Sequence, residues 1–131
     1  QEIGEWTFWD CNKVCISVIP EHVSKIGRLA FTCCEGIKAL VFKNQLLVIN
    51  DRAFSGCKNL ERIVFPNNLR EISDFAFARC INLKGINLPA SLQKIGYRAF
   101  GNCESLLFVK YNSNPKVDSS AFMNCPISQE K

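Results

Sequence analysis

The stretch ISDFAFARCINLKGINLPASL, residues 72–92, holds one complete unit of a pattern that runs through almost the whole chain. Its Ala-Phe-x-x-Cys step recurs at a constant interval, and only the last interval is shorter, by a single position. The Phe positions of this step, including the Thr-Phe copy upstream, are Phe8, Phe31, Phe54, Phe77, Phe100 and Phe122. A period this regular predicts one supersecondary unit stacked on itself, which is a solenoid rather than a globule with a pocket.

Length and composition agree with a single domain over residues 1–131, with five repeats and a partial sixth. The hydrophobic content of 47% with 21% charged residues is ordinary for a folded protein and argues against disorder. The net charge is only +4 and Lys and Arg are spread over every repeat, so we do not expect nucleic-acid binding. No apolar stretch is long enough to span a bilayer. Because both ends interrupt a repeat, we expect a piece of a longer protein.

Each unit predicts two extended segments and one tight turn. The alternation in Leu83–Leu88 is typical of a short strand with its Ile and Leu side chains facing inward, and Pro89 ends the ladder. A second extended segment, Leu92–Ile95, runs back along the other side. The Ala-Phe-x-x-Cys step is expected to form a single helical or 3₁₀ turn that closes the coil, with Phe filling the interior in every copy.

These residues resemble the BspA-like (Treponema-type) leucine-rich repeat, whose units of about 23 residues share the Ala-Phe, Cys and Leu-x-x-Ile-x-Leu-Pro signatures. The resemblance implies an α/β-type right-handed coil, with a parallel sheet of short strands on the concave face and 3₁₀ or helical turns on the convex side. The first two units depart from the pattern. Ser17 stands where a strand Ile belongs, Lys43 replaces the Pro, and Trp9 occupies a phase of smaller residues.

The outward strand positions are expected to line the concave face and to bind a partner protein. By phase they are Ile16, Val18, Ala39, Val41, Arg62, Val64, Gly85, Asn87, Phe108 and Lys110. Six of the ten are Ile, Val, Ala or Phe, whereas a solvated face should be polar. A contiguous apolar stripe marks an interface more often than scattered apolar residues do. Simple strand propensity is the competing explanation.

The eight cysteines invite a disulfide framework, but six of them follow the repeat phase. Equivalent side chains in a translated stack are parallel, so their sulfurs lie side by side rather than converging. We therefore expect a ladder of buried thiols. Cys15 and Cys33 break the phase and are the candidates for a bridge or a reactive thiol. A zinc site formed from Cys11, Cys15, Cys33 and Cys34 is the alternative. It is disfavoured because the pair Cys11 and Cys15 would have to meet the pair Cys33 and Cys34 across adjacent coils.

No catalytic constellation is evident. The only histidine, His22, follows Pro20 in a turn without an evident partner, so a solvated loop position explains it better than a general base. The acidic residues Asp51, Asp74 and Glu71 are expected on a solvent-facing ridge rather than in a cleft. We accordingly expect no cofactor, no metal and no enzymatic activity.

Three functions remain in competition. The first is a protein-binding module of a surface or secreted protein, which acts in adhesion or in recognition of a host or partner protein, as the resemblance implies. The second is a structural spacer or self-assembly segment that presents another domain and associates with itself through uncapped ends. The third is a fragment of an enzyme that depends on Cys33 or on a Cys-bound metal. Direct membrane insertion is not expected, and a cell-surface or secreted location follows from the resemblance alone.

Overall fold

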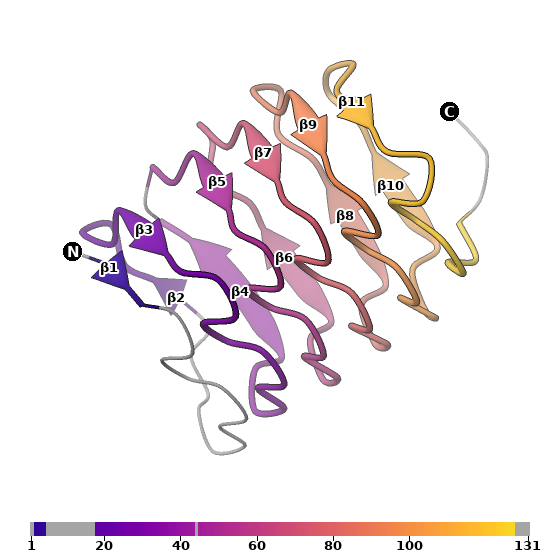
Figure 1. The fold of residues 1–131 in the computed structure, drawn as a ribbon, viewed down its shortest axis with the longest axis horizontal. Coiled ribbons are helices and arrows are strands. Elements are labelled where there is room, and N and C mark those ends of the chain that lie inside the picture. Colours follow the sequence, from indigo (N-terminus) through magenta and orange to yellow (C-terminus); the bar gives the residue numbers. More distant parts are fainter. Residues whose placement is uncertain (1, 5–17, 44, 128–131) are drawn as a thin grey trace.

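A computed structural model describes residues 2–4, 18–43 and 45–127, which form a stack of coils built from short parallel strands. Figure 1 shows the strands in two columns, because each coil contributes one strand to each column. All strand pairs are parallel, and each joins neighbouring coils. The solenoid predicted from the regular repeat is confirmed.

The even-strand column carries the Leu-x-x-Ile-x-Leu segments of the repeat. Its strands are β2 (Val18–Ile19), β4 (Ala39–Phe42), β6 (Arg62–Val64), β8 (Gly85–Asn87) and β10 (Phe108–Lys110). Hydrogen-bonded ladders join β2–β4–β6 and β8–β10. Ile86 and Leu88 are buried, as the alternation predicted.

The odd-strand column carries the second extended segment of each unit. Its strands are β1 (Glu2–Ile3), β3 (Lys25–Ile26), β5 (Val48–Ile49), β7 (Glu71–Ile72), β9 (Lys94–Ile95) and β11 (Lys116–Val117). The ladders here are β1–β3 and β5–β7–β9–β11. The return of the chain along the other side of the coil is therefore confirmed.

Lys43, which replaces the repeat's Pro, changes the strand before it. Its backbone N–H donates to the carbonyl of Ile19 in the preceding coil over 3.0 Å. Proline has no N–H to donate, so Pro66 and Pro89 cannot make this bond. β4 accordingly has four residues, whereas β6 and β8 have three.

The predicted helical or 3₁₀ turn is wrong for the described residues, which contain no helix. In one coil, the amides of Arg52, Phe54 and Gly56 donate to carbonyls of the next coil over 2.8–3.1 Å. The amides between them, those of Ala53 and Ser55, donate to carbonyls three residues earlier in their own coil. A 3₁₀ helix would keep every amide bond within the coil.

Two left-handed residues per coil make this alternation possible. Arg52 and Gly56 have φ angles of 56° and 76°, and Arg98 and Asn102 in a later coil have 49° and 61°. A residue with positive φ interrupts right-handed helical winding, so the segment becomes a series of single turns. The turn is thus held by the neighbouring coils as much as by its own sequence.

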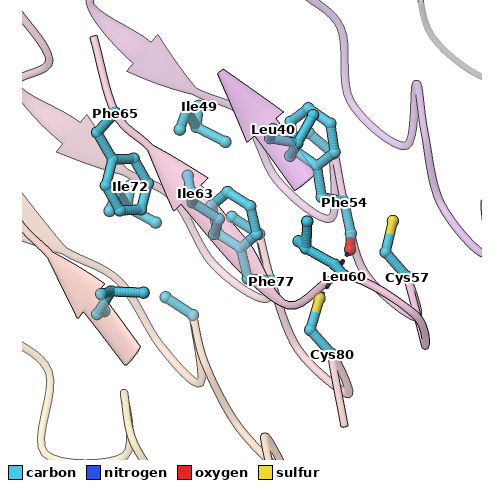
Figure 2. Close-up of a cluster of buried hydrophobic side chains, with 14 of the residues drawn as sticks. Leu40, Ile49, Phe54, Cys57, Leu60, Ile63, Phe65, Ile72, Phe77 and Cys80 are labelled. Carbon is cyan, nitrogen blue, oxygen red and sulfur yellow. Dashed lines mark hydrogen bonds between the residues drawn. The ribbon is translucent and has the colours of Figure 1, made fainter. Parts of the chain in front are cut away.

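The core is a column of phenylalanine rings between the two strand columns. Phe31, Phe54, Phe77 and Phe100 are fully buried and their rings lie face to face, with centroids 5.0–5.3 Å apart. Figure 2 shows Phe54 and Phe77 among leucine and isoleucine side chains from both columns. The predicted interior position of the repeat's Phe is confirmed for these four copies.

We predict that Phe77→Ala lowers the free energy of unfolding by about 3–5 kcal/mol, because it leaves a cavity between two stacked rings. Urea unfolding followed by circular dichroism measures this difference. Phe108→Ala is the matched control: this ring is 66% exposed, so we expect a change within about 0.5 kcal/mol. Equal losses in the two variants would contradict a stability that depends on the ring column.

Candidate functional site

The candidate site is the outward face of the even-strand column. Strand register places Val18 opposite Val41, and Val41 opposite Val64. We call these three residues the valine row. Val18 and Val64 are 42% and 57% exposed, and Val41 between them is half-buried. Three coils therefore present one contiguous line of apolar side chains on this face.

A second row of outward residues runs beside the valine row. Ala39 lies opposite Arg62 in the ladder, and Phe108 lies opposite Gly85. A Cβ at Gly85 would lie 3.6 Å from Phe108 Cβ, which is ordinary van der Waals contact. Along this row Ala39 is followed by Arg62, Gly85 and Phe108. Phe108 is therefore separated from the valine row rather than continuous with it.

The remaining predicted residues make the C-terminal part of the face polar. Asn87 and Lys110 are exposed and lie opposite each other in the β8–β10 ladder. The Asn87 side-chain oxygen accepts a hydrogen bond from the Asn112 amide over 2.8 Å. The described residues form no ladder between β6 and β8, so the face is built from two ladders. Ile16, the tenth predicted residue, lies outside the described residues.

Tyr111, which was not predicted from the sequence, follows β10 and is 41% exposed. Its phase is that of Leu88, which is buried in the preceding coil. Partial burial raises the pKa of the Tyr111 hydroxyl. The signal that could have found it is its polar hydroxyl in a phase otherwise held by Ile, Leu and Phe.

The acidic residues on the turns are held in structural contacts. Asp51 forms ion pairs with Arg28 and Arg52, each over 2.9 Å. The Asp74 carboxylate accepts the backbone N–H of Tyr97 over 2.9 Å. Glu71 accepts a bond from the neighbouring Ser73 hydroxyl. None of these contacts pairs two carboxylates, so they provide no acid–base pair of the kind that glycosidic or proteolytic chemistry uses.

The in-phase cysteines of the described chain are thiols, and those of the inner coils are buried: Cys34, Cys57, Cys80 and Cys103. Each sulfur of the last three donates to the carbonyl of the repeat's Phe in the preceding coil over 3.2–3.3 Å. The bond from Cys80 to the Phe54 carbonyl is drawn in Figure 2. The ladder of buried thiols is confirmed for these positions.

The environment of the ladder suppresses thiolate formation in its interior. Burial, with the adjacent Cys57 side chain, raises the pKa of the Cys80 thiol well above its ordinary value. The Cys125 side chain and burial raise the pKa of Cys103. At the last coil the effect reverses, because the Cys103 side chain lowers the pKa of the half-buried Cys125.

Of the two cysteines that break the repeat phase, Cys15 and Cys33, the structure describes only Cys33. Cys33 is an exposed thiol. Cys11 and Cys15 lie outside the described residues, so the alternative zinc site that includes them lies partly outside as well. Within the described part of the chain, no three His, Cys, Asp or Glu side chains gather as a metal site would require. His22 is exposed in the turn that begins at Pro20. The described residues also contain no helix that could cross a membrane.

Comparison with known proteins gives one family match. Six copies of the model described as "BspA type Leucine rich repeat region" match residues 1–128. No curated protein sequence matches the chain.

The solved structures similar to this chain are also leucine-rich repeat proteins. A leucine-rich cell surface protein from Faecalibacterium prausnitzii A2-165 is similar with a TM-score of 0.80 and 30% identity. The alignment covers 86% of this chain and 30% of that one. The leucine-rich repeat protein of T. pallidum has a TM-score of 0.76 and 30% identity, over 85% and 55% of the two chains. A leucine-rich repeat protein from Eubacterium ventriosum has a TM-score of 0.90 and 27% identity. The alignment covers 98% of this chain and 35% of that one. The chain thus spans between about a third and about half of these proteins.

Thiol reactivity should follow position in the ladder. We predict that iodoacetamide at pH 8 labels Cys33, which is exposed, and then Cys125, whose lowered pKa favours the thiolate. Cys57, Cys80 and Cys103 should be labelled only after denaturation, and raising the pH to 9 should not expose them. Peptide mapping by mass spectrometry reads each position separately. Labelling of Cys80 as fast as Cys33 in the folded protein would contradict the buried ladder.

Proposed function

This chain belongs to the BspA-type leucine-rich repeat family, and from that membership we propose that it is a non-enzymatic protein-binding module. The face of the even-strand column is its recognition surface. The observation that carries this proposal is the valine row, in which three β-branched side chains line up across three coils and two of them are exposed. Neighbouring parallel strands lie about 4.8 Å apart, so the row is contiguous.

The chemistry around the row matches that of a protein interface. Interfaces combine an apolar centre with a polar rim, and arginine and aromatic residues are enriched in them. Arg62 lies beside the valine row on β6, and Asn87 and Lys110 follow it on β8 and β10. Phe108 adds an exposed aromatic ring at the far end of the face. The face therefore offers apolar area for affinity and charge for selectivity.

The biological setting of the proposal comes from the relatives. One similar structure is that of a cell surface protein, and the others are bacterial leucine-rich repeat proteins. We infer that this chain also acts at a cell surface or in secreted form, where it recognises a host or partner protein in adhesion.

A photo-crosslinking amino acid placed at position 64 tests where the partner binds. On incubation with surface-protein extracts of candidate partner cells, we expect crosslinked adducts from position 64. The same probe at position 94, on the exposed side of β9, should give none. Adducts of equal yield from both positions would show non-specific contact and would contradict the proposal.

Substitutions then test whether the valine row supplies the affinity for the crosslinked protein. We predict that Val41→Lys and Val64→Lys each weaken binding by at least about tenfold, because each places a charge in a desolvated apolar centre. The matched control is Val48→Lys on β5, a half-buried valine of the other column. Surface plasmon resonance measures the affinities, and circular dichroism checks that all three variants fold. Wild-type affinity in Val64→Lys would refute a role for this row.

A further inference from the structure

A second surface lies on the turns, away from the even-strand face. It is a groove of about 230 Å³ that crosses three successive coils. Its lining residues are Arg52, Ser55, Phe75, Ala78, Arg79, Arg98, Gly101 and Asn102. We call this the arginine groove, because three of the eight side chains are guanidinium groups.

The repeat itself explains why a groove forms here. Each of the three turns that line the groove has two left-handed residues four positions apart, and these residues form two parallel ridges; one ridge is Arg52, Phe75 and Arg98. Arg79 and Asn102 belong to the other ridge. The residues between the ridges are small in the middle coils: Ser55, Ala78 and Gly101. The same phase holds the buried Thr32 in the preceding coil and the exposed Met123 in the following coil.

Gly101 is the smallest residue of the groove floor. A Cβ built at this position would lie 3.1 Å from the Cβ of Arg98 and 3.3 Å from its carbonyl oxygen. A side chain at this position would require Arg98 to shift by a few tenths of an ångström. Glycine leaves the space above the floor open beside the Arg98 guanidinium.

The charges of the groove are only partly compensated by the protein. Arg52 is neutralised by Asp51 and stacks over the Phe75 ring, with the guanidinium carbon 4.3 Å from the ring centroid. Arg79 and Arg98 have no ion pair with any carboxylate among the described residues. Glu104 lines a neighbouring depression that shares Arg79, but it forms no ion pair with this arginine in the described chain.

One donor in the groove is left without an acceptor. Arg98 Nε is buried and makes no hydrogen bond, and it is the one buried side-chain nitrogen or oxygen of the described residues in this condition. The rest of the Arg98 guanidinium lies 5.2 Å from the Tyr97 ring centroid, a contact that supplies no acceptor for Nε. A buried charged donor without an acceptor is costly, so the Arg98 side chain gains by turning its Nε–H toward an acceptor that a ligand supplies in the groove.

We propose that the arginine groove binds an oxyanion of the carboxylate or phosphate class, carried on a small organic group. The Nε–H of Arg98 and the guanidinium of Arg79 donate to its oxygens, since planar guanidinium forks match both kinds of oxyanion. The side-chain amide of Asn102 lies on the same ridge as Arg79 and offers a further donor. Phe75 provides an apolar wall for the organic part. The groove has room for several water volumes, which exceeds a bare ion.

Nuclear magnetic resonance of the arginine side chains tests this site directly. The Nε–H signal of Arg98 is followed during titration of the intact chain with sodium phosphate and with sodium acetate. Sodium chloride at equal ionic strength is the reference. We expect a saturable shift of this signal with at least one of the two anions and only a small linear drift with chloride. Saturation with phosphate alone or acetate alone supports the proposal and assigns the ligand class.

Three variants distinguish specific anion binding in the groove from non-specific attraction to positive charge. Arg98→Lys keeps the positive charge but removes the Nε–H, and Arg79→Gln removes an exposed charge. We expect each to weaken binding by about tenfold, as loss of a charge-assisted hydrogen bond does. Arg70→Gln is the control, because Arg70 is exposed, precedes β7 and lines no part of the groove.

The proposal is overturned if neither anion shifts the Arg98 signal more than chloride does, or if Arg79→Gln binds as tightly as Arg70→Gln. Should Arg98→Lys fail to fold, Arg79→Gln still decides, because its side chain lies on the surface. The site lies on the turns and shares no residue with the valine row. Its failure would therefore leave the proposed protein-binding function untouched.

Discussion

Face-to-face stacking of the repeat's phenylalanine rings is the constraint on which the rest of the structure depends. Parallel strands advance by about 4.8 Å per coil. The rings are 5.0–5.3 Å apart, so each coil must repeat the one before with little lateral shift.

The one shortened repeat shows how strictly this holds. Phe108 pairs with Gly85 a full period earlier, whereas Lys116 pairs with Lys94, so the missing residue falls in the loop between β10 and β11. Phe122 accordingly still stacks on Phe100 at 5.3 Å.

The phenylalanine column also explains the turn and the cysteine. A coil that must follow its neighbour closely can donate alternate amides to it, and the left-handed residues orient those amides across the gap. Left-handed backbone costs a non-glycine residue roughly 1–2 kcal/mol, and the bonds to the adjacent coil compensate for it. Cysteine fits beside the ring because it is small and apolar, yet its S–H reaches the Phe carbonyl of the preceding coil. Alanine would fill less space and would donate nothing.

The strands could be predicted from the sequence because their signal is local. The alternation around Ile86 and Leu88 assigns each side chain to a face, and one unit is enough to see it. The turn could not be predicted in the same way. Asn102 and Gly56 are residue types that tolerate positive φ, but Phe75 and Arg98 are not, and they adopt it because the neighbouring coils hold them there.

The valine row follows from phase, since Val41 and Val64 are a full period apart and pair in the ladder. Phe108 falls in another phase, that of Arg62 and Gly85, so the sequence period also separates it from the valines. The arginine groove left no motif at all, since its residues come from three units and more than one phase.

The size of the valine row constrains how a partner must bind. A stable protein interface buries about 800 Å² on each partner, which is far more than three valine side chains can provide. A partner that uses this row must therefore extend over polar neighbours such as Arg62, Asn87 and Lys110. Desolvated polar groups need matched partners, so the rim imposes selectivity and also keeps water away from the valines at the centre. Each outward side chain can vary without disturbing the phenylalanine column, because strand alternation keeps the two sets on opposite faces. The same core can consequently support different recognition surfaces, and under the proposed function the charged and amide side chains around the valine row would set the selectivity of this chain.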